Sequence, residues 1–132
     1  MIDLKPVRSA LEMNEKPNVV VVVMRCSRVR KSSGVRFEKR VENKWVGTWA
    51  FELKEASAER EGYEKTAIGG SISLDNTYPG CPHCNARALF KCGKCNKVGC
   101  WDGESKVVIC PWCGNKGEIS GYIEILNASH DR

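Results

Sequence analysis

The chain has 132 residues, enough for one ordinary domain or two small ones, and its 28% charged and 42% apolar residues are typical of a globular rather than a disordered protein. Its longest apolar run, Val19–Met24, is far too short to span a membrane. The formal charge of +5 invites a nucleic-acid interpretation, but that count treats all eight cysteines as neutral.

The first quarter of the chain predicts an arm, a buried strand and a charged loop. Residues 1–17 are polar and carry two prolines, which predicts a flexible N-terminal arm, with a short helix at Val7–Met13 as the alternative. Val19–Met24 is continuously apolar and largely β-branched, so we expect a strand that is buried on both faces. Residues 25–33 follow as a charged loop, and its cations are Arg25, Arg28, Arg30 and Lys31. Such a loop suits phosphate or an acidic partner, although solvated charges that protect a sheet edge are the commoner role.

Two further strands and a short helix are predicted next. Gly34–Val41 alternates between apolar and polar residues, residues 42–44 suit a hairpin loop, and Trp45–Leu53 forms the returning strand. Residues 54–63 suit one or two helical turns, and Thr66–Leu74 reads as one strand with a bulge at its glycine pair. Four large side chains of the returning strand would point to the same face and are predicted to face the core, with stacking on nucleic-acid bases as the alternative. They are Trp45, Trp49, Phe51 and Leu53.

Seven of the eight cysteines lie between residues 81 and 113, as three Cys-x-x-Cys pairs and one single residue. They are Cys81, Cys84, Cys92, Cys95, Cys100, Cys110 and Cys113. A gap of two residues lets a tight turn aim both sulfurs at one ion, and a tetrahedral zinc site takes two such pairs. The spacing therefore predicts structural zinc.

Three rival interpretations of the cysteines are weaker. Iron–sulfur ligation is disfavoured because the ferredoxin spacings are absent. Disulfides are disfavoured because residues 1–6 lack the apolar core of a signal peptide, which predicts a reducing, cytoplasmic location. Residues 81–84 resemble a thioredoxin-type redox site, but that chemistry needs a following helix, and residues 85–91 are too short to form one.

Seven cysteines are one ligand short of two four-sulfur sites. His83 is the leading candidate for an eighth ligand, although a surface position for its ring is slightly favoured, and Asp102 is a weaker candidate. Cys26 would have to fold back from a distance in sequence, so a free buried thiol is favoured there. We expect two Zn²⁺ ions, and seven thiolates with two Zn²⁺ would lower the formal charge to about +2.

The pairing of the cysteines stays open at this point. One possibility joins the first and last pairs and leaves Cys92, Cys95 and Cys100 as an incomplete site. A sequential arrangement joins the first and second pairs. A cross-brace joins the second pair to Cys110 and Cys113.

The predicted architecture is mainly β, with a small antiparallel β-sheet domain at 18–79 joined to a zinc-ribbon or zinc-knuckle domain at 80–126 and a tail at 127–132. The strands expected in the second domain are Ala88–Lys91, Lys97–Trp101, Lys106–Cys110 and Glu118–Leu126. This half has few large apolar residues and should need metal to fold. The sequence contains no P-loop, no zinc-protease motif and no deaminase signature, and sulfur-saturated zinc sites are normally structural, so we expect no enzymatic activity.

Four segments of the chain resemble one known family. Residues 45–51, 60–66, 78–84 and 110–114, which read Trp-Val-Gly-Thr-Trp-Ala-Phe, Arg-Glu-Gly-Tyr-Glu-Lys-Thr, Tyr-Pro-Gly-Cys-Pro-His-Cys and Cys-Pro-Trp-Cys-Gly, are similar to the metal-binding domain at the C-terminus of the TerY tellurite-resistance proteins. The resemblance covers roughly residues 18–117.

The resemblance implies a cytoplasmic zinc module that works through protein contacts in bacterial stress-response and phage-defence systems. In that family the domain follows a von Willebrand factor A domain, and its gene neighbours encode a protein kinase and a phosphatase, so these are the expected partners. This chain would be a stand-alone version. The alternatives are a nucleic-acid-binding zinc ribbon that uses the arginine-rich loop and, less favoured, a thiol oxidoreductase with a reactive Cys81.

Overall fold

A computed structural model describes residues 18–54, 66–123 and 125–130. The predicted N-terminal arm, nearly all of the predicted helical turns and most of the second resemblance segment lie outside these residues.

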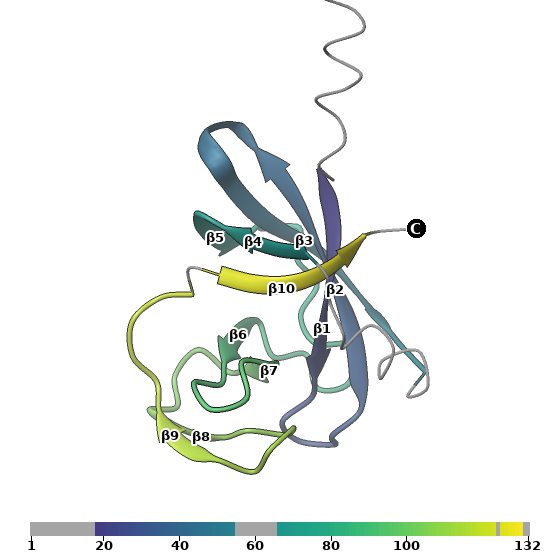
Figure 1. Ribbon diagram of the computed structural model, residues 1–132. Helices are drawn as coiled ribbons and strands as arrows, with labels where there is room; N and C mark the ends of the chain where they lie inside the picture. Colours follow the sequence, from purple (N-terminus) through teal and green to yellow (C-terminus); the bar gives the residue numbers. More distant parts are fainter. Residues whose placement is uncertain (1–17, 55–65, 124, 131–132) are drawn as a thin grey trace, which may run out of the picture.

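The described residues form a mainly β structure with no α-helix (Figure 1). The first half contains β1 (Val19–Arg25), β2 (Ser32–Arg40), the short 3-10 turn η1 (Val41–Asn43), β3 (Lys44–Glu52), β4 (Thr66–Gly69) and β5 (Ser71–Leu74). The second half contains β6 (Ala88–Lys91), β7 (Val98–Trp101), β8 (Val107–Ile109), β9 (Lys116–Glu118) and β10 (Ile125–His130).

One sheet in the order β4-β10-β1-β2-β3-β5 dominates the fold. Its two edge strands, β4 and β5, are separated in sequence by Gly70 alone, so the sheet must curl until its edges nearly meet. Gly70 adopts a φ of 113°, and a Cβ there would collide with the carbonyl oxygen of Asn43. The prediction of one bulged strand over Thr66–Leu74 is therefore wrong, because the chain changes sheet edge at this glycine.

β1 is the central strand, as its apolar sequence predicts. All five residues from Val20 to Met24 are buried. β1 pairs with β2 and β10 in antiparallel fashion and, at its end, with β7 in parallel fashion, where Met24 lies opposite Val98. The core residues around it include Phe37, Tyr78 and Leu126. Because β7 and β10 join this sheet, the segments predicted as two domains share one framework.

The β2–β3 pairing contains a bulge that reverses the facing of β3. Arg36 lies opposite Trp49 while Phe37 lies opposite Gly47, so Thr48 is an extra residue. Trp45 is buried before the bulge, but Trp49 after it is 53% exposed, and Ala50 is buried instead. The prediction that the large residues of this strand all face the core fails for Trp49 because one inserted residue moves every later side chain to the opposite face.

The C-terminal strand differs from the prediction. The expected strand at Glu118–Leu126 is replaced by β9, a connection that includes Gly121 with a φ of 67°, and β10. Leu126 lies opposite Ile68 of β4, and Asn127 lies opposite Ala67. The tail predicted from residue 127 therefore begins inside β10, where the neighbouring strands supply the backbone partners that a free tail lacks.

Candidate metal centres

Four turns in the described part of the chain share the same backbone geometry. They span residues 26–31, 81–86, 92–97 and 110–115, and each begins with a cysteine. In every turn the cysteine N–H donates to the carbonyl of the residue five positions later, as Cys26 does to Lys31 at 2.9 Å. The cysteine carbonyl accepts a hydrogen bond from the N–H of the residue four positions later, as Cys26 does from Arg30 at 2.9 Å. The turns are therefore repeats of one structural unit.

The fourth residue after each cysteine has a positive φ, which closes the turn. The values are 58° at Arg30, 65° at Asn85, 63° at Asn96 and 79° at Gly114. Asparagine and glycine tolerate this left-handed conformation best, whereas arginine is unusual there. In three of the turns the backbone N–H two residues beyond the cysteine lies 3.4 Å from its Sγ, as Arg28 N–H does from Cys26. Such donors stabilise a thiolate.

The eight cysteines gather into two groups of four. The first group is Cys26, Cys81, Cys84 and Cys100, and the second is Cys92, Cys95, Cys110 and Cys113. Within each group all sulfur atoms lie within 4.8 Å of one another. All eight cysteines are free of disulfide bonds. Two four-cysteine groups that can each hold a metal ion are therefore built into the fold.

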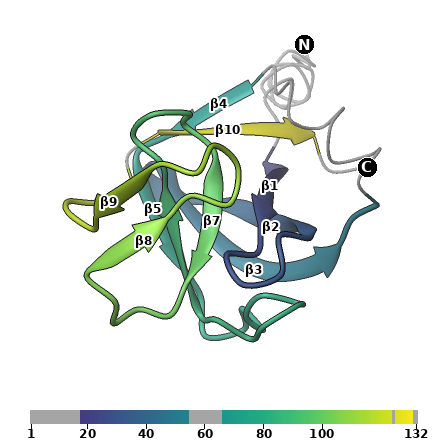
Figure 2. The same cartoon turned by 90° about the horizontal axis from the view of Figure 1, so that it is seen from below.

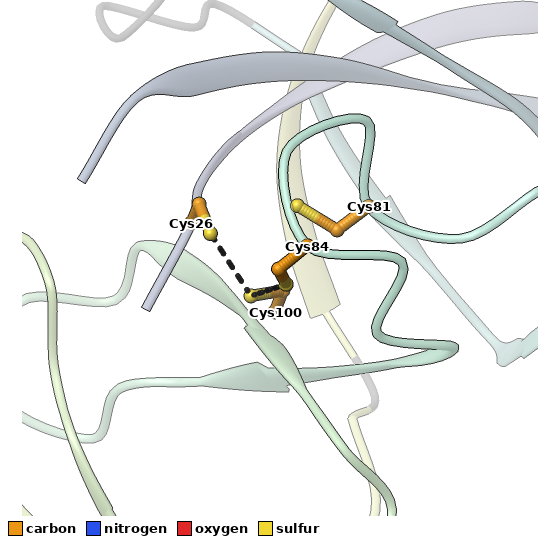
Figure 3. Close-up of side chains that lie close together, drawn as sticks. All are labelled: Cys26, Cys81, Cys84 and Cys100. Carbon is orange, nitrogen blue, oxygen red and sulfur yellow. Dashed lines mark hydrogen bonds between the residues drawn. The ribbon is translucent and has the colours of Figure 1, made fainter. Parts of the chain in front are cut away.

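The sulfur spacing fits tetrahedral zinc. Zn–S bonds of about 2.3 Å place the corners of a tetrahedron about 3.8 Å apart. In the first group the sulfur of Cys100 lies 3.5 Å from that of Cys84 and 3.8 Å from that of Cys26 (Figure 3). In the second group the corresponding distances are 3.7 Å for Cys92–Cys113 and 3.6 Å for Cys95–Cys110.

The first group joins three separate parts of the chain inside the main core. Cys26 follows β1, the 81–86 turn precedes β6, and Cys100 lies in β7. The side chains converge on one point in Figure 3. Ser27 fixes the contact, because its N–H lies 3.2 Å from the Cys100 sulfur and its hydroxyl donates to the Cys100 carbonyl at 2.7 Å. Cys26 and Cys81 are fully buried.

The second group is more exposed and rests on a smaller core. Two Cys-x-x-Cys turns face each other, and Cys113 is exposed to solvent. Among the described residues, the buried core of this group consists of Phe90, Cys92 and Cys110 alone. With so small a core, this part of the molecule, which includes the β8–β9 hairpin, would depend on a metal ion for its folding more than the β-sheet would. Figure 2 shows the hairpin standing beside the main sheet.

In each group the pKa of one cysteine is lowered while the pKa values of two others are raised. Hydrogen bonding from Cys81 lowers the pKa of Cys100 to about 5 despite its burial, and the Cys81 pKa is raised in return. Burial raises the pKa of Cys84 to about 11 and that of Cys95 to about 12. Burial opposes ionisation of Cys92, but the N–H groups of Cys95 and Lys94 hold its pKa at about 6. A divalent ion must therefore displace protons from the thiols whose pKa values are raised, which are Cys81, Cys84, Cys95 and Cys110.

Two predicted ligand candidates lie outside both groups. The His83 ring places Nε2 3.1 Å from the Ser32 carbonyl and Nδ1 3.5 Å from a Glu52 carboxylate oxygen, so both nitrogens face away from the sulfurs. Asp102 accepts hydrogen bonds from its own turn, including the Ser105 hydroxyl at 2.6 Å, and this lowers its pKa to about 2.

Cys26 is the candidate ligand that sequence reasoning did not favour. The structure brings it to three cysteines more than fifty positions away, instead of leaving it as an isolated buried thiol. One signal in the sequence pointed to it. Eight cysteines divide into two groups of four only when Cys26 is included. Of the three pairings considered, the structure shows the cross-brace of Cys92 and Cys95 with the last pair.

Trp112 connects the two groups. Its ring lies under the guanidinium of Arg25, 4.0 Å from the ring centroid, and near the ammonium of Lys97 at 4.5 Å. Its indole N–H donates to the Val98 carbonyl at 2.8 Å. Arg25 directly precedes Cys26, so the arginine predicted as a partner contact packs between the two candidate sites. The other three cations of that loop, Arg28, Arg30 and Lys31, are exposed.

Comparisons of the chain with protein-family models, with curated proteins and with solved structures found no match. None of the described residues forms a helix that is long and apolar enough to cross a membrane.

Proposed function

We propose that this protein is a non-catalytic module held together by two structural zinc ions, and that it acts through protein contacts in a cytoplasmic, tellurite-resistance-like stress or phage-defence system of bacteria. The observation that carries the structural part is the division of all eight cysteines into two four-sulfur groups with tetrahedral spacing. Four sulfurs saturate a zinc ion and leave no open position for a substrate or an activated water.

The two ions would have different structural tasks. In the first group one ion would tie the end of β1 to the 81–86 turn and to β7, which joins the two halves of the sheet. In the second group one ion would hold together a region with few buried apolar side chains. Both tasks are structural, because metal binding supplies folding free energy where the apolar core is small.

The geometry does not favour the thiol oxidoreductase. That activity needs an accessible Cys81 with a low pKa, but Cys81 is fully buried and the neighbouring Cys100 raises its pKa. The 81–84 segment continues into a turn and the strand β6, where a thioredoxin-type site has a helix.

The TerY resemblance supports the biological part of the proposal, and several residues that carry it also build the first candidate site. Tyr78 is 1% exposed and lies in the core beside Cys81. Gly80 adopts a φ of 95°, and a Cβ there would lie 2.9 Å from the Asn85 carbonyl oxygen, inside the first Cys-x-x-Cys turn. Trp45 is buried in the same core. The resemblance thus rests on residues with a structural reason to be there.

The test is direct binding to the partners that the resemblance implies. The zinc-loaded chain should bind a purified von Willebrand factor A domain, kinase or phosphatase of a tellurite-resistance system, measured by isothermal titration calorimetry. The same chain stripped by a chelator should not bind, because both sites would be open. Absence of binding by the zinc-loaded chain to all three partners would contradict the protein-contact proposal while leaving the metal sites intact.

A further inference from the structure

The turn at residues 26–31 is a zinc knuckle without its second cysteine. It has both backbone hydrogen bonds and the positive φ of the three Cys-x-x-Cys turns. The position three residues after the first cysteine is Cys84, Cys95 or Cys113 in those turns, but Val29 in this one. Cys100 of β7 completes the group instead. The tip of this turn is therefore released from metal binding and is available for another role.

The released tip is rigid. Besides its two internal backbone hydrogen bonds, the turn is fixed by the Arg28 N–H on the Cys26 sulfur at 3.4 Å. Ser27 makes two further contacts with Cys100. A loop held at its base by buried sulfurs presents its side chains with little loss of backbone entropy on binding.

The side chains that the tip presents are mainly cationic. Arg28, Arg30 and Lys31 are exposed and make no ion pair with any other residue in the described ranges. Two carboxylates of the described region, those of Glu52 and Asp102, face other groups: Glu52 lies beside the His83 ring, and Asp102 accepts from its own turn. The four turns together contain five Lys or Arg residues and no Asp or Glu.

From this arrangement we infer that the 26–31 turn is a preformed contact site for the phosphate backbone of a nucleic acid. Phosphates are contacted by Arg and Lys side chains and by backbone N–H groups. A protein interface would need an apolar or aromatic centre, whereas the tip offers one exposed apolar side chain, Val29. The large cavity of the described region, about 830 Å³, lies elsewhere, between β5, β6 and residues 117–123.

Binding through three phosphate contacts should depend on salt concentration to a measurable extent. Eight thiolates and two Zn²⁺ lower the formal charge from +5 to about +1, so general attraction to a polyanion is weak and the binding must be local. Three phosphate contacts predict a slope of about −2.7 for log affinity against log salt concentration on duplex DNA. Affinity should then fall about 40-fold between about 50 and about 200 mM salt.

The test uses the full zinc-loaded chain and a fluorescein-labelled duplex of mixed sequence, followed by fluorescence anisotropy. The triple substitution R28A/R30A/K31A should abolish most of the salt-dependent binding. The matched control, K39A/R40A/K44A, removes the same charge from the closed end of the β2–β3 hairpin. This end lies at the other end of β2 from the 26–31 turn, so the control should bind as the unsubstituted chain does. Native mass spectrometry of both variants should show two zinc ions, which excludes loss of fold as the cause.

Three results would overturn the inference. One is no binding to the duplex at about 50 mM salt, where three phosphate contacts should be detectable. Another is an equal loss in both triple variants, which would show a net-charge effect. The third is stronger competition by an acidic polyglutamate peptide than by unlabelled duplex, which would assign the tip to an acidic protein.

Discussion

Replacing Trp112 should uncouple the two candidate metal sites at a measurable energetic cost. Cation–π contacts with Arg25 at 4.0 Å and Lys97 at 4.5 Å are worth about 0.5–1 kcal/mol each. The indole hydrogen bond to the Val98 carbonyl contributes about 1 kcal/mol, and partial burial of the ring about 1 kcal/mol more. The W112A variant should therefore lower the free energy of unfolding by about 3 kcal/mol.

The assay is urea unfolding followed by circular dichroism at a fixed free zinc concentration, because bound metal shifts the apparent stability by mass action. The W112F variant keeps an aromatic ring but loses the indole N–H, so it should lose roughly half as much stability. If the free energy of unfolding of W112A lies within about 0.5 kcal/mol of that of the unsubstituted chain, the ring does not link the two sites.

Three further predictions concern the sites themselves. By native mass spectrometry the C100S variant should hold one zinc ion, and V29C/C100S should hold two, because the 26–31 turn already has the geometry of a Cys-x-x-Cys turn. The control V29S/C100S should hold one. A chromogenic chelator should remove zinc in two phases, with the exposed second group emptying first; a single phase would contradict the difference in burial. At pH 7, zinc binding to the metal-free chain should release at least four protons, because the pKa values of Cys81, Cys84, Cys95 and Cys110 are raised and these thiols are protonated. Zinc affinity should accordingly rise with pH, and calorimetry in buffers of different ionisation enthalpy measures the proton count.

Local patterns in the sequence predicted much of the fold. The apolar run at Val19–Met24 and the short strand at Ala88–Lys91 are confirmed because neighbouring residues alone decide them. The bulge at Thr48 was not predicted, and the change of edge at Gly70 was predicted as a bulge, since both depend on which strand pairs with which. The last strand was predicted too early in the chain for the same reason, because the partners of β10, which are β1 and β4, are remote in sequence.

The candidate metal centres were predictable in part. The spacing of the Cys-x-x-Cys pairs identified metal-ligand chemistry and seven of the eight cysteines, because a ligand pair within one turn is a local feature. The grouping was not determined by spacing, because it depends on how the strands bring the turns together. Cys26 shows this most clearly, since it reaches its group only after β1 and β7 pair side by side.

The most direct test of the account is the zinc content of the purified chain and its C26S variant, measured by native mass spectrometry against the denatured mass. We predict two zinc ions in the unsubstituted chain and one in C26S, because Cys26 is a ligand of the first group and lies apart from the second. Two tightly held ions in both proteins would show that Cys26 is not a ligand and would contradict the division of the cysteines into two groups of four.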